Sequence, residues 1–161
     1  MSEFIHLYTD GSSRGNPGPG GYGIVLRYKD KYKELSKGYR LTTNNRMELL
    51  AVIHGLNQLK TSALPVRVFS DSKYVIDSIQ KGWIYGWLKT NFKGKKNKDL
   101  WLEYLNAAKG LKIEFIWVKG HNGHPENEKC DQLAVNAATG SNLLVDEGYE
   151  NEAQKGLSNL D

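Results

Sequence analysis

The sequence contains a single cysteine, Cys130, so it cannot form an internal disulfide or a cysteine-based zinc finger. It also lacks any apolar run close to the ~20 residues that cross a membrane. Residues 1–10 include Glu3 and Asp10 and lack the basic start and apolar stretch of a signal peptide. These absences favour a reducing environment, and we expect a cytoplasmic protein that does not contact a membrane.

Length and composition predict one folded domain. The chain has 161 residues, of which 39% are apolar and 25% charged, and this is ordinary globular usage. A chain of this size can bury a core without disulfides or metals. Apolar periodicity fades after Gly140, so we expect a domain over residues 1–140 and a flexible, acidic tail over residues 141–161.

Positive charge is concentrated in the middle of the chain. The net charge is +4, from 22 basic and 18 acidic residues. Residues 73–112 contain nine lysines and three acidic residues, whereas residues 141–161 contain one basic and five acidic residues. A basic segment is typical of proteins that bind polyanions, but a solvated lysine-rich face gives the same pattern. Charge alone leaves both interpretations open.

Hydrophobic periodicity predicts an α/β fold. We expect strands over residues 3–9, 22–28, 33–41, 65–69 and 112–118, a glycine-rich loop over 11–21, and helices over 45–60, 72–80, 82–88, 97–108 and 125–139. An antiparallel meander of the first three strands is then followed by strands separated by helices. This order predicts a mixed five-stranded sheet with added parallel strands, flanked by helices.

Four carboxylates lie at or near the ends of predicted elements: Asp10, Glu48, Asp71 and Asp131. Each has a structural alternative, respectively a turn, a capping box with Asn45, a helix N-cap and an exposed helical charge. If the first and fourth strands are adjacent and parallel, however, Asp10 and Asp71 emerge at one edge of the sheet, where α/β proteins place their sites.

Converging carboxylates repel one another unless a cation lies between them. Mg²⁺ prefers oxygen ligands, and two such ions about 4 Å apart form a site that hydrolyses phosphodiesters. A zinc site at His121, His124 and Cys130 is a competing interpretation. It lacks a fourth ligand, and Cys130 lies on an apolar helical stripe. His124 precedes Pro125 and is better explained as a helix-entry residue.

Four motifs carry a family resemblance. They are Tyr-Thr-Asp-Gly-Ser (residues 8–12), Asn-Asn-Arg-Met-Glu-Leu (44–49), Ser-Asp-Ser-Lys-Tyr-Val (70–75) and Lys-Gly-His-Asn-Gly-His-Pro-Glu-Asn-Glu-Lys-Cys-Asp (119–131). In this order and spacing they closely resemble the bacterial branch of the type 1 ribonuclease H family. The resemblance extends over about residues 4–140 and implies that residues 1–140 form a catalytic domain with the ribonuclease H-like fold.

The resemblance also implies an activity. Members of this family are endonucleases that cleave the RNA strand of RNA–DNA hybrids with two divalent ions, leaving 5′-phosphate and 3′-hydroxyl ends. The metal is normally Mg²⁺, with Mn²⁺ a candidate substitute. By motif position the metal ligands would be Asp10, Glu48, Asp71 and Asp131, and His121 would assist proton transfer or product release.

Candidate substrate contacts fall into two groups. Gly11, Asn16, Asn44 and Asn45 match the family positions that read the RNA strand, whose 2′-hydroxyls are reachable from a shallow minor groove. The asparagines have helix capping as a structural alternative. Lys73 lies beside Asp71 and either touches the hybrid or screens the carboxylates.

The second group resembles the basic protrusion, or handle, with which the family binds the DNA strand. Residues 82–98 combine aromatic side chains with lysines that can neutralise phosphates, and they form a handle slightly shorter than usual. The candidate contacts are Trp83, Lys89, Lys93, Lys95, Lys96 and Lys98. Alternatively Trp83, Trp87 and Trp101 belong to the core, and we expect that at least one of them does.

Two other functions compete with hydrolysis of a hybrid. A non-catalytic hybrid-binding module would not need the complete carboxylate set, and a related metal-dependent DNA nuclease would not need the handle or the Gly-His-x-Gly-His segment. We therefore expect a monomeric ribonuclease H whose partner is an RNA–DNA hybrid duplex.

Overall fold

The computed structural model describes residues 3–59, 63–120 and 124–158. None of the helices in these ranges is long and apolar enough to cross a membrane. The elements are β1 (Ile5–Ser13), β2 (Gly18–Tyr28), β3 (Lys31–Thr42), α1 (Asn44–Asn57), β4 (Val66–Ser70), α2 (Lys73–Gln80), α3 (Trp83–Lys89), α4 (Lys98–Ala108), β5 (Ile113–Trp117), α5 (Pro125–Ala138) and α6 (Glu147–Ser158).

The strands form one mixed sheet in the order β3-β2-β1-β4-β5, which confirms the predicted architecture. β1, β2 and β3 are antiparallel neighbours, whereas β4 pairs in parallel with β1 and β5 in parallel with β4. Tyr8 lies opposite Phe69 in the pair of β1 and β4. Asp10 and Asp71 each follow this pair by two residues, so the sheet register brings both carboxylates to the same edge.

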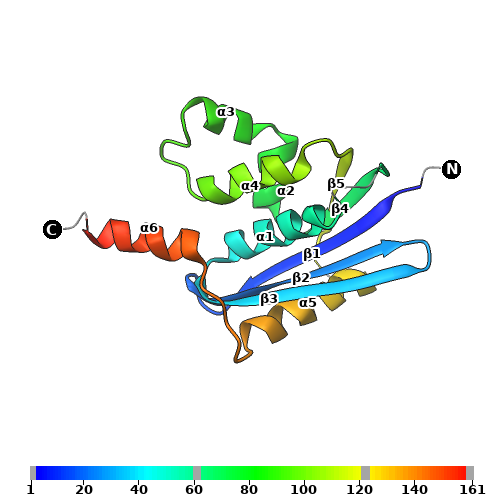
Figure 1. The fold of residues 1–161 in the computed structure, drawn as a ribbon, viewed down its shortest axis with the longest axis horizontal. Coiled ribbons are helices and arrows are strands. Elements are labelled where there is room, and N and C mark those ends of the chain that lie inside the picture. The colour runs from blue at the N-terminus through cyan, green and yellow to red at the C-terminus, as the bar shows by residue number, and fades with distance from the viewer. Residues whose placement is uncertain (1–2, 60–62, 121–123, 159–161) are drawn as a thin grey trace.

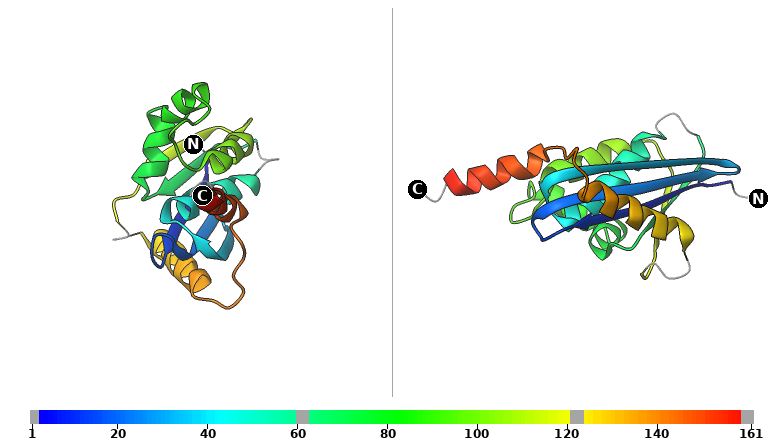
Figure 2. Two further views of the ribbon diagram at one scale, coloured as in Figure 1. Left: turned by 90° about the vertical axis from the view of Figure 1, so that its left-hand side faces the viewer. Right: turned by 90° about the horizontal axis from the view of Figure 1, so that it is seen from below.

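Helices cover both faces of the sheet (Figures 1 and 2). α5 lies on one face, against β1 to β3, and α1 lies on the other with α4 packed against it. Leu7, Ile24, Met47, Leu49 and Trp101 are fully buried members of the core. This frame fixes the N-terminal part of α1 beside Gly11, in the C-terminal half of β1.

The glycines of β2 allow α5 to approach the sheet closely. A Cβ atom on Gly23 would lie 2.2 Å from the carbonyl oxygen of Cys130, and one on Gly21 would lie 2.5 Å from that of Ala134. The predicted loop over residues 11–21 is therefore wrong over much of its length, because β1 continues to Ser13 and β2 starts at Gly18. Glycine here serves packing between layers rather than a turn.

The expectation of a flexible tail is wrong for residues 144–150. Leu144 forms a β-bridge with Tyr39, and α6 projects from the body of the molecule (Figure 1). Asp146 is buried and accepts hydrogen bonds from Arg46 Nε (2.8 Å) and Thr42 Oγ1 (2.6 Å). The hydrogen bonds and ion pair of Asp146, and not an apolar helix face, attach this segment to the domain. Hydrophobic periodicity therefore does not reveal it. The domain boundary near residue 140 stays a prediction.

Candidate active site

Three of the predicted carboxylates converge. Oxygen atoms of Asp10, Glu48 and Asp71 all lie within 4.8 Å of one another. Asp10 and Glu48 are each only 3% exposed, and Asp71 is partly buried. They come from β1, α1 and the residue after β4, three elements that the core holds rigidly together. The arrangement brings three carboxyl groups together, and two of them are almost completely shielded from solvent.

Gly11 sets the distance between β1 and α1. A Cβ atom at this position would lie 2.3 Å from the backbone nitrogen of Glu48, so only glycine lets the helix start this close to the strand. The Gly11 N–H donates to Asp10 Oδ1 at 3.0 Å and also to Glu48 Oε1. One backbone donor thereby orients two of the carboxylates.

The structural alternatives for these carboxylates are wrong. Thr43 caps α1 by accepting from Arg46 N at 3.3 Å, and Ser72 caps α2 by accepting from Val75 N at 3.2 Å. Asp10 lies within β1 rather than in a turn. Glu48 and Asp71 therefore do not serve as the helix caps, and their side chains remain directed to the cluster.

The electrostatic environment of the cluster favours a bound cation. Burial, followed by the charges of Asp10 and Asp71, raises the pKa of Glu48 well above its usual value. Burial and like charges both disfavour an ionised carboxyl, and a bound cation reverses the second effect. A set of ligands that consists only of closely spaced carboxylates fits a hard divalent ion such as Mg²⁺.

Asp131 lines the same cavity from α5, which lies on the opposite face of the sheet from α1. The cavity has a volume of about 380 Å³, and its walls include all four predicted carboxylates. Asp131 is only partly buried and lies outside the tight group of three. The predicted Gly11, Asn44, Asn45 and Lys73 also line the cavity, together with Ser12, Ser72 and Tyr74, which the sequence patterns did not predict. Ser12 and Ser72 could have been found, because each lies within two residues of a predicted carboxylate.

The remaining predicted polar residues have different positions. Asn16 is not among the residues that line the cavity, but it accepts a hydrogen bond at 3.1 Å from the backbone nitrogen of Asn44, which does line it. His121 lies outside the described residues. His124 is the N-cap residue of α5, which confirms its helix-entry position. Cys130 is fully buried, and burial raises the pKa of its thiol, so it is a core residue rather than a zinc ligand.

The handle consists of α3, the loop over residues 90–97 and the start of α4. Trp83 is 46% exposed, whereas Trp101 is fully buried, which confirms that at least one tryptophan belongs to the core. Phe92 is also buried and anchors the loop, in which Lys98 Nζ donates to Asn91 Oδ1 at 2.7 Å.

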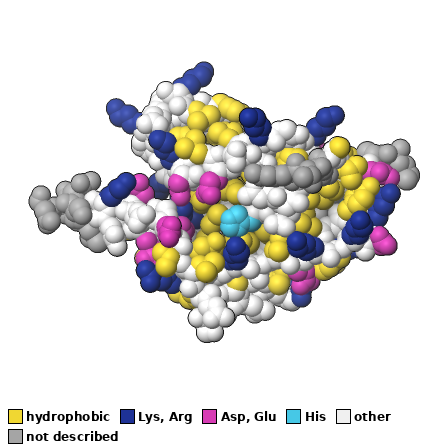
Figure 3. Space-filling model, in the orientation of Figure 1, with side chains coloured by type: hydrophobic (Ala, Val, Ile, Leu, Met, Phe, Trp, Pro, Cys, Tyr) yellow, Lys and Arg dark blue, Asp and Glu magenta, His cyan; other side chains and the backbone are white. Residues whose placement is uncertain are grey.

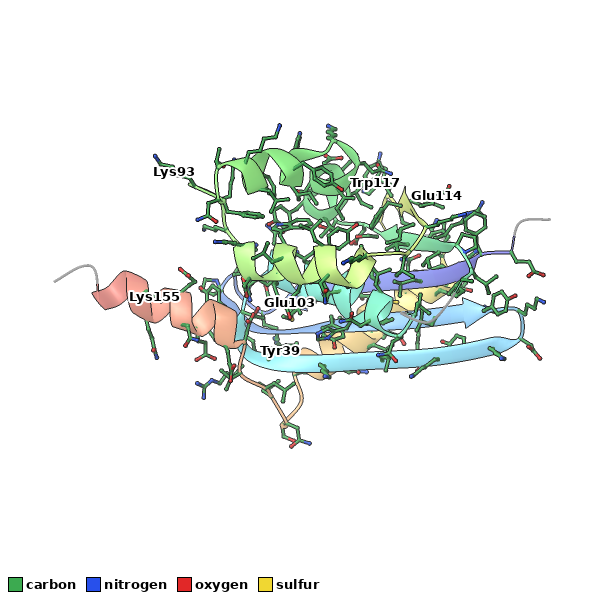
Figure 4. All side chains as sticks on the ribbon, turned by 45° about the horizontal axis from the view of Figure 1, so that its top comes forward. Tyr39, Lys93, Glu103, Glu114, Trp117 and Lys155 are labelled. Carbon is green, nitrogen blue, oxygen red and sulfur yellow. The ribbon has the colours of Figure 1, made fainter. Side chains whose placement is uncertain are left out.

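The other handle lysines are exposed: Lys89, Lys93, Lys95 and Lys96. Lys93 points away from the sheet at the loop end of the handle (Figure 4), and Lys and Arg side chains protrude from this upper part of the molecule (Figure 3). The handle therefore presents several exposed lysines on a small, internally packed platform.

Comparisons with known proteins agree with this geometry. The family profile described as RNase H matches residues 2–139. The chain is 54% identical to the ribonuclease H of Aeromonas salmonicida (strain A449) over 155 residues, which cover 93% of this chain and 99% of the relative. Among solved structures, it is similar to LC9-RNase H1, a type 1 RNase H with the type 2 active-site motif, with a TM-score of 0.76, 34% identity and coverage of 95% of this chain and 82% of that one. It is also similar to LC11-RNase H1 in complex with an RNA/DNA hybrid, with a TM-score of 0.66, 26% identity and coverage of 83% and 96%.

Proposed function

Because this chain belongs to the ribonuclease H family, whose members cleave the RNA strand of RNA–DNA hybrids, we propose that it performs this reaction with divalent metal ions at the carboxylate cavity. The observation that carries the proposal is the buried cluster of Asp10, Glu48 and Asp71, whose oxygen atoms lie within 4.8 Å of one another. A similar protein has been solved with an RNA/DNA hybrid, which supports the proposed substrate.

The proposed metal ligands are Asp10, Glu48, Asp71 and Asp131. Asp10 on β1 has both Glu48 on α1 and Asp71 after β4 as neighbours and would hold the ions together with them, while Asp131 lines the cavity from α5. Mg²⁺ is the proposed ion, and Mn²⁺ a candidate substitute, because both accept carboxylate and water ligands. When bound, two such ions supply an activated water and stabilise the leaving 3′-oxygen.

The chain itself orients the reacting groups. The Gly11 N–H fixes the carboxylates of Asp10 and Glu48, so little reorganisation is needed when ions and substrate arrive. No side-chain nucleophile is required, because water would attack the phosphorus in line with the leaving 3′-oxygen. The products would carry a 5′-phosphate and a 3′-hydroxyl end. We propose that His121 assists proton transfer or product release from the segment between β5 and α5.

Recognition of the RNA strand is assigned to the cavity wall. Gly11, Asn44 and Asn45 are small or polar and lie beside the carboxylates, where they can reach a 2′-hydroxyl in the minor groove. Asn16 holds Asn44 through its hydrogen bond to the backbone. This arrangement would distinguish the RNA strand from DNA at the position where it is cut.

Recognition of the DNA strand is assigned to the handle. Its exposed lysines neutralise phosphates, and the exposed face of Trp83 offers a surface for a sugar or base. Lys98 contributes differently, since its ammonium is already bound to Asn91 within the handle. We further propose that the protein acts as a monomer in the cytoplasm.

A single assay tests the proposed function. An RNA–DNA hybrid, duplex RNA and duplex DNA, each labelled in both strands, are incubated with the protein and either Mg²⁺ or a chelator. We expect cleavage of only the RNA strand of the hybrid, and only with Mg²⁺. Binding of the hybrid without cleavage would indicate a binding module, and cleavage of duplex DNA would indicate a DNA nuclease.

A further inference from the structure

Lys73 occupies an unfavourable place for a positive charge. It is the first residue of α2, where the helix dipole disfavours a cation. It also lines the cavity that contains the four carboxylates, whose negative charge attracts its ammonium. A further contact, with an aromatic ring, fixes the position of this ammonium.

The indole of Trp117 supplies this contact. Lys73 Nζ lies 3.9 Å from the centroid of the Trp117 ring, well within the ~6 Å range of cation–π interactions. Trp117 is the last residue of β5 and is 41% exposed, so it is not explained as a core residue (Figure 4). By contrast, Trp101 is fully buried.

The sheet fixes the indole as well. Trp117 lies opposite Ser70 in the parallel pair of β4 and β5, and Ser70 is the residue before Asp71. Trp117 Nε1 donates to the backbone oxygen of Asp71 at 3.4 Å. The edge of the ring is thus attached to the segment that carries a proposed metal ligand, and its face is presented to Lys73.

We propose that Trp117 is a positioning residue that holds the Lys73 ammonium at the rim of the carboxylate cavity, where it binds a backbone phosphate of the RNA strand. The proposal rests on the proposed function, because it assumes that the hybrid enters this cavity. A free lysine side chain samples many rotamers and loses that freedom on binding a phosphate. The ring removes part of this loss before the substrate arrives, and so improves binding of the hybrid.

A double-mutant cycle tests this role with the variants Trp117→Leu, Lys73→Met and their combination. Binding of a defined RNA–DNA hybrid is measured by fluorescence anisotropy with chelator present, and KM and kcat are measured with Mg²⁺. We expect Trp117→Leu to raise Kd and KM about two- to five-fold, the range of an exposed cation–π contact, with kcat changed little. Lys73→Met should raise Kd at least as much and flatten the slope of log K against log salt by about 0.9.

The decisive result is the combination. With Lys73→Met present, Trp117→Leu should have no further effect on Kd. Trp117→Phe alone should have a Kd between those of the wild type and Trp117→Leu, because it keeps an aromatic face but loses the Nε1–H donor to Asp71. Lys112→Met, at the far end of the β5 segment, is the matched control and should leave Kd unchanged. Thermal denaturation of each variant separates loss of binding from loss of folding.

Two outcomes overturn the inference. One is an equal effect of Trp117→Leu in both backgrounds, which would mean that the indole acts independently of Lys73. The other is a wild-type Kd in Trp117→Leu. If the wild-type protein binds the hybrid but does not cleave it, the proposed function fails, whereas the cycle measured by binding still decides the role of Trp117. Absence of hybrid binding by the wild type overturns both.

Discussion

At the scale of one side chain, Glu48 shows how repulsion between carboxylates lowers the stability of the metal-free protein and increases its affinity for a metal ion. The side chain is buried beside Asp10 and Asp71, and this raises its pKa. Without a cation, the folded protein must either protonate a carboxyl or tolerate the repulsion. The same repulsion becomes an attraction once a divalent ion is bound, so the instability of the metal-free fold is recovered as metal affinity.

The first prediction concerns Asp10→Asn. Removing this charge should lower Mg²⁺-dependent cleavage by about 10³-fold or more, since metal stabilisation contributes several kcal/mol to the barrier. Binding of the hybrid should persist, and the thermal midpoint without metal should stay level or rise because repulsion in the cluster falls. Asp77→Asn, which removes a carboxylate paired with Lys81 on α2, is the control and should cleave normally. Near-normal turnover of Asp10→Asn would remove the metal assignment.

The second prediction concerns pH and His54. Burial, and next the charge of Lys37, lowers the pKa of His54, and the ring contacts the Tyr22 hydroxyl. The unfolded chain, with a histidine pKa of about 6.5, therefore binds more protons than the folded one below that pH. The contribution of His54 to stability is complete above about pH 6.5 and is lost as the pH falls below it.

Urea denaturation between about pH 7 and pH 5 measures this contribution. We expect the free energy of unfolding to fall less steeply in His54→Gln than in the wild type. Burial also lowers the pKa of His6, so part of the histidine-dependent slope should remain in His54→Gln and should decrease further in the variant that also carries His6→Gln. Identical slopes in the wild type and in His54→Gln would show that this histidine does not contribute.

At the scale of the element, the C-terminal segment is attached by charge. Arg46, only 3% exposed, binds Asp146 through Nε at 2.8 Å and Asp99 through Nη2 at 2.7 Å. Deleting residues 144–161 leaves this guanidinium with Asp99 as its remaining carboxylate. Breaking a buried pair costs about 3–5 kcal/mol, so the truncation should lower stability by roughly 3 kcal/mol.

A shorter deletion, which keeps Asp146, serves as the control for the Arg46–Asp146 ion pair. Removing residues 151–161 keeps Asp146 and also Glu150, which pairs with Arg40 at 2.8 Å. This variant should lose less than about 1 kcal/mol, because residues 151–155 are exposed and the ion pairs of Asp146 and Glu150 remain. Equal stability of the two truncations in urea denaturation would show that Asp146 is not what attaches the segment.

The handle yields a prediction about salt. Changing Lys93, Lys95 and Lys96 to alanine should raise KM for the hybrid and leave kcat at saturation nearly unchanged, because these lysines would bind ground state and transition state equally. The slope of log K against log salt should flatten by about 0.9 for each phosphate that these lysines no longer neutralise. Removing the same charge from β3, with Lys31, Lys33 and Lys37 changed to alanine, should have a smaller effect. If the two triple variants behave alike, net charge rather than the handle attracts the hybrid.

At the scale of the whole molecule, the mixed five-stranded sheet and the identity of the candidate carboxylates could be predicted from local patterns. Asp10 lies in the C-terminal half of β1 and Asp71 follows β4, and these two parallel strands run toward one edge of the sheet. Asp146 could not be predicted in this way, since its partner Arg46 is 100 residues away in the sequence and no periodic pattern links them. Trp117 could not be predicted for a similar reason, because its relation to Lys73 depends on the pairing of β4 with β5.

Metal ions held by these carboxylates should contact the phosphate that is cleaved. A hybrid with a phosphorothioate at one cleavage site reports on this contact when its rate of cleavage is measured with Mg²⁺ and with Mn²⁺. Sulfur is a softer ligand than oxygen, so it suits Mg²⁺ poorly and Mn²⁺ better. We expect slow cleavage at that site with Mg²⁺ and substantial recovery with Mn²⁺. Equal rates for oxygen and sulfur with both ions would contradict direct contact between the metal ions and the phosphate.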